Sequence, residues 1–254
     1  MPDDLIPPDP ATALRVGVVV PPSNPVVEPE FSALLGPEVL LYGNRLPRIA
    51  DPDLMVRNRG YVTSYSDTLD ALAGLDLACA LIAMTGPNYH LGLQGDRQLC
   101  DALSDQLGAP VHTASMAIHE ALESLGIDRL HLLSPYPPQL TDETVHYWSD
   151  AGWDVTGVTG MLAGGQQFHA YETSSEAVTE ALRGSRPEPG SAVVITGTGL
   201  VSVSSIYRTR DQFDVPVLSS NLCGAWWTLL TCGASAGSAL YEAIAAGHMP
   251  PLAA

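Results

Sequence analysis

An apolar run that ends in a Thr-Gly turn occurs twice in this chain, and this repeat constrains the fold more than any other feature. The first copy is Ala-Leu-Ile-Ala-Met-Thr-Gly-Pro-Asn at 80–88, and the second is Ala-Val-Val-Ile-Thr-Gly-Thr-Gly-Leu at 192–200. Short apolar runs of this kind are typical of strands buried in a parallel sheet. A helix-length segment and a second short strand follow each copy, at 109–115 and 215–221. Two related halves that each present a Thr-Gly turn predict one site between them.

Strands and helices alternate along the rest of the chain. We expect strands at 14–20, 39–42, 78–83, around 111, 130–133, 153–158, from 192 and around 217, and helices at 26–35, 51–75, 93–107, 115–125, 141–151, 176–182 and 223–230. This order predicts an α/β protein in which helices cover parallel sheets on both faces. In such sheets ligands bind beyond the carboxyl ends of the strands. Residues 51–75 have the spacing of a helix. We expect the side chains on its inward face to be Leu54, Tyr61, Tyr65, Leu69 and Leu72.

Composition excludes several classes of protein. The formal net charge of −17 argues against nucleic acid, which requires a basic face. The amino-terminal segment lacks the features of a signal peptide, and no apolar run reaches the roughly 18 residues of a membrane span. We therefore expect a cytoplasmic protein that binds neither nucleic acid nor membrane. The four cysteines have no C-x-x-C spacing, and no cluster has metal-ligand spacing, so we expect no metal.

The loops beyond the expected strand ends are rich in hydroxyl and amide side chains and poor in charge. Such groups suit the binding of a carboxylate or an oxyanion. The alternative is that each is an ordinary helix N-cap, and for any single residue this is the stronger interpretation. Among the histidines, only His90 and His169 fall where they could reach such a site. The loop residues are Ser23, Asn24, Thr85, Asn88, Tyr136, Thr198, Ser219, Ser220 and Asn221.

At this point the chain resembles the Asp/Glu racemase superfamily, and within it the branch of arylmalonate decarboxylases and maleate cis-trans isomerases. The motifs that carry the resemblance span nearly the whole chain in the right order. They are residues 17–24 (Gly-Val-Val-Val-Pro-Pro-Ser-Asn) with 28–30 (Glu-Pro-Glu), 84–89 (Met-Thr-Gly-Pro-Asn-Tyr), 111–115 (Val-His-Thr-Ala-Ser), 125–136, 198–200 and 215–221.

The resemblance implies two pseudo-symmetric parallel-sheet α/β lobes with the active site in the cleft between them and no cofactor. The expected division is a loose or disordered tail at 1–13, a first lobe at 14–114 plus roughly 220–254, and a second lobe at 115–219. The expected partner is a small carboxylate or dicarboxylate substrate. The sequence leaves a homodimer open, because members of the family differ in this respect.

Racemases and maleate isomerases of the superfamily carry one cysteine at each of two turns, and decarboxylases keep only the second. The resemblance aligns those positions with Met84 and Gly197, so both cysteines are expected to be absent here. A thioether has no ionisable proton and glycine has no side chain, so neither can replace a thiol.

What the resemblance leaves is a frame for binding carboxylates. It implies that Asn24, Thr85, Tyr136 and Thr198 hold the carboxylate oxygens, and Tyr136, Thr85 and Thr198 are the catalytic candidates. Proton delivery would need Tyr136, a threonine hydroxyl, His90, His169 or water. Threonine is a poor acid without a base to activate it, so we rank Tyr136 and an ordered water above it. The implied substrate-binding set is Asn24, Ser23, Gly86, Asn88, Gly199 and Asn221. These residues predict a cofactor-independent lyase or isomerase with proton chemistry that does not use cysteine. Two alternatives stay open: a hydrolase or hydratase in which a threonine positions water, and a carboxylate-binding protein without catalysis.

Overall fold

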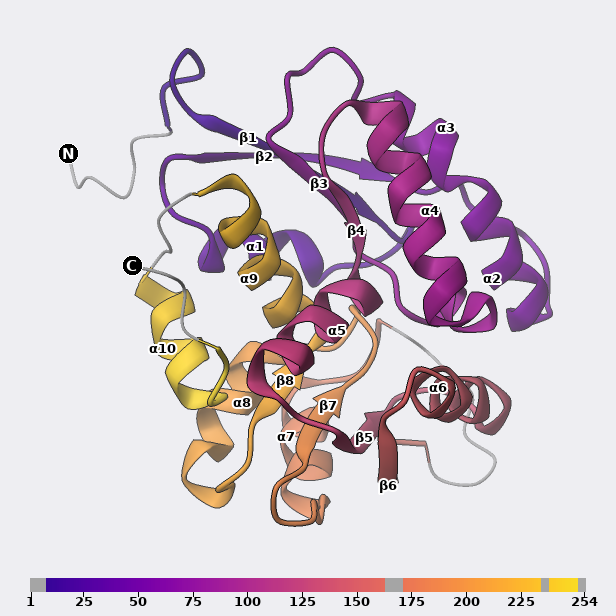
Figure 1. Ribbon diagram of the computed structural model, residues 1–254, viewed down its shortest axis with the longest axis vertical. Coiled ribbons are helices and arrows are strands. Elements are labelled where there is room, and N and C mark those ends of the chain that lie inside the picture. Colours follow the sequence, from indigo (N-terminus) through magenta and orange to yellow (C-terminus); the bar gives the residue numbers. More distant parts are fainter. Residues whose placement is uncertain (1–7, 163–170, 234–237, 251–254) are drawn as a thin grey trace.

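The computed structural model describes residues 8–162, 171–233 and 238–250. Its strands form two four-stranded sheets in which every neighbouring pair is parallel. The first sheet has the order β2-β1-β3-β4 and the second the order β6-β5-β7-β8, so the same arrangement occurs twice (Figure 1). The strands are β1 Leu14–Val20, β2 Val39–Arg45, β3 Cys79–Ile82, β4 Val111–Thr113, β5 Arg129–Ser134, β6 Asp154–Gly160, β7 Ala192–Ile195 and β8 Val217–Ser219. The expected two-sheet α/β architecture is confirmed.

Helices connect the strands throughout. They are α1 Val27–Leu34, α2 Leu54–Thr63, α3 Tyr65–Asp70, the 3-10 helix η2 Gly86–Leu91, α4 Gly92–Leu107, α5 Ala114–Leu125, α6 Pro138–Asp150, α7 Ser175–Gly184, α8 Val203–Thr209, the 3-10 helix η3 Arg210–Gln212, α9 Ser220–Cys232 and α10 Ser238–Ala246. None of these described helices is long and apolar enough to cross a membrane.

Two local predictions were wrong, and each has a physical cause. The expected helix 51–75 is broken at Ser64, where the hydroxyls of Thr63 and Ser64 both donate to the carbonyl of Gly60, at 2.9 and 2.8 Å. Such bonds compete with helix continuation. Helix α5 begins at Ala114, one residue before the expected start at 115, because Thr113 caps it by accepting a hydrogen bond from the N–H of Met116.

The two sheets share one apolar core. A single cluster of buried side chains runs from Val18 and Leu81 in the first sheet to Leu132 and Val194 in the second. A smaller cluster fills the space between the first sheet and the helices α3 and α4, around Tyr65. The two sheets are therefore packed as parts of one molecule.

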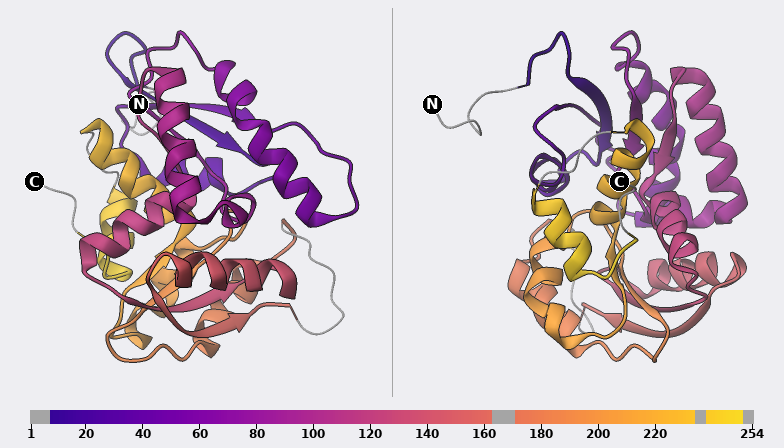
Figure 2. Two further views of the ribbon diagram at one scale, coloured as in Figure 1. Left: turned by 45° about the vertical axis from the view of Figure 1, so that its right-hand side comes forward. Right: turned by 60° about the vertical axis from the view of Figure 1, so that its left-hand side comes forward.

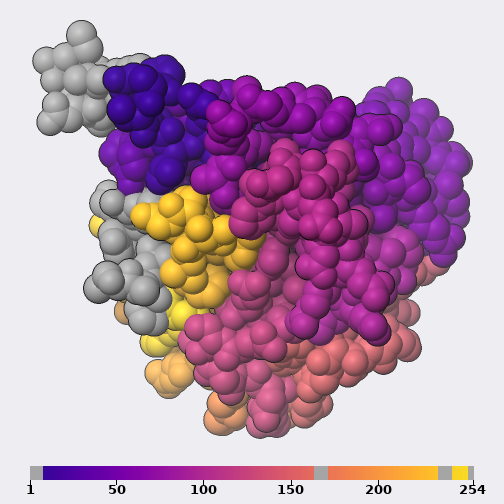
Figure 3. Space-filling model, turned by 45° about the horizontal axis from the view of Figure 1, so that its top comes forward, coloured from indigo at the N-terminus to yellow at the C-terminus, as the bar shows by residue number. Residues whose placement is uncertain are grey.

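Helix α9 joins the two halves. It follows β8 of the second sheet, yet it packs against α5 and against β3 and α1 of the first half (Figure 2). In the space-filling view it emerges, in yellow, between the first-half elements and α5 (Figure 3). Ten of its residues are buried. The expected lobe boundaries at 114/115 and 219/220 stay a prediction, and residues 1–7 of the expected tail lie outside the described residues.

Candidate active site

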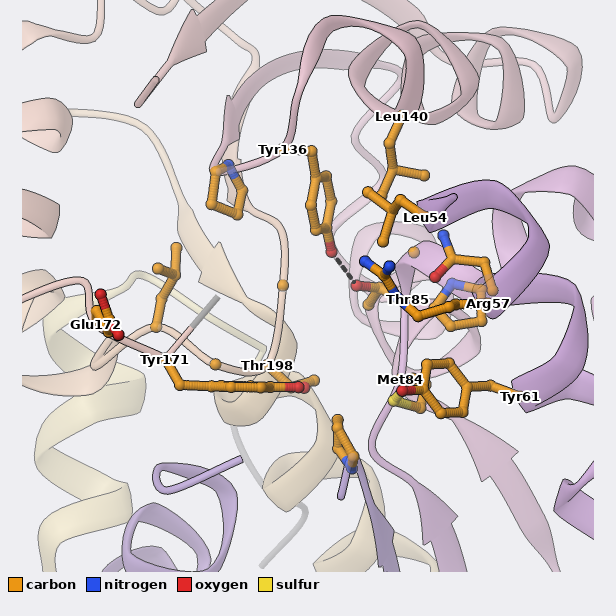
Figure 4. Close-up of a pocket in the computed structure, with 18 residues that line it drawn as sticks. Leu54, Arg57, Tyr61, Met84, Thr85, Tyr136, Leu140, Tyr171, Glu172 and Thr198 are labelled. Carbon is orange, nitrogen blue, oxygen red and sulfur yellow. Dashed lines mark hydrogen bonds between the residues drawn. The ribbon is translucent and has the colours of Figure 1, made fainter. Parts of the chain in front are cut away.

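A cavity of about 340 Å³ lies beyond the carboxyl ends of strands from both sheets. The segments that follow β1, β3, β5 and β7 all contribute to its wall, as the topology of parallel sheets requires. Side chains from α2 and from the segment before α7 complete it (Figure 4). The lining residues are Pro21, Leu54, Arg57, Asn58, Tyr61, Met84, Thr85, Gly86, Pro87, Pro135, Tyr136, Leu140, Tyr171, Glu172, Gly197, Thr198, Gly199 and Leu200.

Both Thr-Gly turns face this cavity. Met84, Thr85 and Gly86 come from the first turn, and Gly197 to Gly199 come from the second. Gly197 has a φ of 86°, a left-handed backbone conformation that residues other than glycine rarely adopt. In the part of the chain that the structure describes, the N–H groups of residues 197–199 donate to no acceptor. They are therefore available to a bound anion.

The hydroxyl of Tyr136 lies between the two turns. It forms a hydrogen bond of 2.7 Å with the Thr85 hydroxyl of the first turn (Figure 4). It is also 3.2 Å from the place where a Cβ on residue 197 would stand. Burial raises the pKa of Tyr136 to about 12, although the hydrogen bond with Thr85 acts in the opposite direction. The phenol is therefore protonated at neutral pH and has a proton that it can donate.

Thr198 is already engaged in hydrogen bonds that cross between the two halves. Its hydroxyl donates to the carbonyl of Ala83 at 2.9 Å and accepts from the side-chain amide of Asn24 at 3.2 Å. A hydroxyl has one proton, so Thr198 cannot donate to a ligand while it keeps the bond to Ala83. The geometry favours a positioning role for this side chain.

Four of the predicted substrate-binding residues lie outside the cavity wall. Ser23 is exposed, and Asn24 caps the start of α1 through bonds to the N–H groups of residues 26 and 27. Asn88 is fully buried between Tyr65 and Asp96. The remaining one, Asn221, donates to Glu30 at 2.7 Å and to the carbonyl of residue 198 at 3.1 Å. Asn24 and Asn221 each donate a hydrogen bond to Thr198 of the second turn, whereas the Asn88 side chain bonds to residues outside the cavity wall. Direct contact of any of the four residues with substrate stays a prediction.

Helix α2 supplies a wall that the sequence did not predict as part of the site. Leu54, Arg57, Asn58 and Tyr61 all line the cavity from this helix. Figure 4 shows three of them, Leu54, Arg57 and Tyr61. From their helical spacing, Leu54 and Tyr61 were expected to point into the protein core. In the structure they line the cavity instead. Arg57 and Asn58 have no motif that could have singled them out.

The four cysteines lie outside the cavity wall. Cys79, Cys100 and Cys223 are buried and Cys232 is half-buried, and none of the four lines the cavity. Burial raises the pKa of the Cys223 thiol, so this cysteine is not an ionised nucleophile.

His90 is exposed and outside the cavity, and His169 falls outside the described residues. His119 is buried against Trp153. Within the described ranges no group of His, Cys, Asp or Glu could hold a metal ion.

Solved structures share this fold. The crystal structure of the maleate isomerase Iso from Pseudomonas putida matches with a TM-score of 0.80 at 19% identity, covering 91% of this chain and 99% of that chain. The crystal structure of arylmalonate decarboxylase matches with a TM-score of 0.73 at 20% identity, covering 89% and 96%. The expected Asp/Glu racemase-like fold is confirmed.

The family model for arylmalonate decarboxylase matches residues 16–244. This chain therefore belongs to the arylmalonate decarboxylase family. It is 23% identical to the arylmalonate decarboxylase of Bordetella bronchiseptica over 230 residues, which cover 89% of this chain and 93% of that protein. It is 24% identical to the maleate isomerase of Geobacillus stearothermophilus over 224 residues, covering 83% and 88%. These relatives are enzymes, as their names state.

Proposed function

We propose that this chain is a lyase or isomerase that acts on a small carboxylate, with the cavity between the two Thr-Gly turns as its active site. The cavity gathers hydroxyl groups and unbonded N–H groups, which suit a carboxylate and the charge that develops on it. The relatives named above decarboxylate arylmalonates or isomerise maleate, which supports a carboxylate substrate here.

The position of the Tyr136 hydroxyl carries this proposal. It lies 3.2 Å from a Cβ built on Gly197 and 3.6 Å from one built on Gly86, so it is close to both turns. By resemblance, residue 197 stands where decarboxylases of the family keep their cysteine. The phenol is therefore near the place where that side chain would begin, and we assign to Tyr136 the proton donation that a thiol performs in relatives.

The proposed step balances as follows. When a malonate-type substrate loses CO₂, the electron pair of the broken C–C bond moves into the remaining carboxylate and gives an enediolate. The N–H groups of residues 197–199 stabilise its oxygens. Tyr136 then transfers its proton to the α-carbon, which is a far stronger base than a phenolate. Thr85 stabilises the phenolate through its hydrogen bond until water returns the proton.

Addition of a thiolate to a double bond is not available in this cavity. A solved structure of the Nocardia farcinica maleate cis-trans isomerase contains a covalently bound succinylcysteine intermediate. Here no cysteine lines the cavity, and a threonine hydroxyl is a weak nucleophile without a base to activate it. We therefore place proton transfer at an α-carbon ahead of nucleophilic isomerisation.

The test is turnover of malonate, methylmalonate, phenylmalonate and maleate in D₂O, followed by NMR. We expect deuterium at the α-carbon of the product, and we expect Tyr136→Phe to lower kcat by about 10²–10⁴-fold while carboxylates still raise the melting temperature. Tyr207→Phe is the matched control, because Tyr207 is 45% exposed on α8 and lies outside this cavity.

Three results would contradict the proposal in different ways. Full activity of Tyr136→Phe removes Tyr136 from the mechanism. Incorporation of ¹⁸O from solvent into the product indicates a hydratase or hydrolase. Ligand-dependent stabilisation without turnover of any substrate makes the chain a carboxylate-binding protein.

A further inference from the structure

The charged side chains on the cavity wall are one arginine, Arg57, and one glutamate, Glu172, which comes from the segment before α7. The chain has 11 basic residues against 28 acidic ones, and four of the 11 are arginines between positions 45 and 59. Only Arg57 of these lines the cavity. A single cation on the wall of a partly enclosed cavity attracts anions more strongly than the same charge on an open surface.

Arg57 is half-buried and has no carboxylate partner among the described residues. One of its Nη atoms donates to the backbone carbonyl of Asp51, which positions the side chain without neutralising it. Burial raises the pKa of Tyr61 and of Tyr171, and the charge of Arg57 opposes that rise in both. The guanidinium is therefore close to two phenols of the cavity wall.

The next residue, Asn58, has a buried donor without an acceptor. Its side chain is 5% exposed and lines the cavity, and its Nδ2 forms no hydrogen bond within the described structure. A buried amide left unbonded is unfavourable, and native structures avoid it unless something else supplies the acceptor. Arg57 and Asn58 thus offer a charge and a neutral donor to the same space.

We infer that Arg57 and Asn58 form a subsite on α2 for an anionic group of the substrate, separate from the donors of the second Thr-Gly turn. Helix α2 packs against η2, so this subsite lies on the first-sheet side of the cavity, whereas residues 197–199 belong to the second sheet. The substrate then has two acidic groups, one for each side. This inference rests on the proposed function only for the identity of the cavity as the active site.

The test compares ligands that differ by one charge. Succinate with succinamate, and malonate with malonamate, are nearly isosteric pairs, and their affinities for the full chain are measured by calorimetry. We expect the wild-type protein to favour each dianion by about ten-fold or more, which corresponds to about 1.4 kcal/mol. Arg57→Gln should abolish this preference and Arg57→Lys should keep part of it. Arg59→Gln, an exposed position on the same helix outside the cavity, should leave it unchanged.

A second variant separates binding from folding. Asn58→Leu removes the unbonded buried donor, so we expect a higher melting temperature without ligand and weaker binding of the dianions. Equal affinity for dianions in Asn58→Leu would exclude Asn58 from the subsite. A wild-type protein without dianion preference, or an Arg57→Gln variant that keeps it, would overturn the inference. A wild-type protein that shows Arg57-dependent binding but no turnover would refute the proposed function alone.

Discussion

The buried carboxylate of Asp96 makes stability depend on pH in a direction that can be derived from the structure. Asp96 is fully buried in α4 and accepts hydrogen bonds from Thr113, from Tyr147 at 3.0 Å and from Asn88 at 3.2 Å. Burial raises the pKa of Asp96 from 3.8 to about 7, although these hydrogen bonds oppose the rise, as does the charge of His112.

The sign follows from proton binding. Between pH 3.8 and about 7 the folded chain holds a proton on Asp96 that the unfolded chain has lost, so stability decreases as the pH rises through this range. One pKa unit corresponds to about 1.4 kcal/mol, so the change amounts to at most about 4 kcal/mol. Asn at this position cannot ionise, and its amide can exchange hydrogen bonds with the same hydroxyls.

We therefore expect Asp96→Asn and the wild-type protein to have similar stability below pH 3.8, where the carboxyl is protonated in both the folded and the unfolded chain. At pH 8 the variant should be more stable by up to about 4 kcal/mol. Urea unfolding, followed by tryptophan fluorescence at half-unit steps of pH, measures this difference. Asp105→Asn, an exposed position on the same helix, is the control and should follow the wild-type curve at every pH.

A difference between variant and wild type that stays constant across this pH range would refute the reasoning, because the carboxylate would then have no raised pKa to lose. A difference that grows toward acid pH would refute it too, since that slope requires a lowered pKa. Loss of the folded state at every pH would mean that the ionised carboxylate itself is needed for the bonds to Thr113 and Tyr147.

Two further predictions concern packing and the contacts between halves. Gly224→Ala should destabilise the protein by about 1–3 kcal/mol, because its Cβ would lie 2.7 Å from Leu81 Cδ2. A Cβ at Gly184 on α7 would meet open space, so Gly184→Ala should stabilise the protein by about 0.4–1 kcal/mol. Equal effects of the two substitutions in urea unfolding would contradict the packing argument. Thr198→Val should cost about 1–3 kcal/mol, because it leaves the Ala83 carbonyl without its donor, and an unchanged urea midpoint would show that this bond does not hold the halves together.

The sequence predicted the strands and the two turns because these depend on local patterns. Apolar runs followed by Thr-Gly place β3 and β7 within one or two residues, and the topology of parallel sheets then brings Thr85, Tyr136 and Gly197 together. The turns could be found because their residues follow the strands directly.

The cavity wall on α2 could not be predicted in the same way. Arg57 and Asn58 are ordinary helix residues in sequence, and their importance depends on where α2 packs against η2. Asn88 and Asn221 show the converse, because a polar residue beyond a strand end can point away from the ligand space. Tertiary packing alone decides which side of such a loop faces the cavity.

The position of α9 in the fold determines when the first sheet can complete its packing as the chain is synthesised on the ribosome. The strands of the first sheet are all synthesised once Thr113 has emerged, but the helix that packs against β3 begins only at Ser220. At about 5–20 residues per second, that face of the nascent sheet waits on the order of ten seconds for its cover. During this interval the apolar side chains that α9 later covers lack this part of their packing.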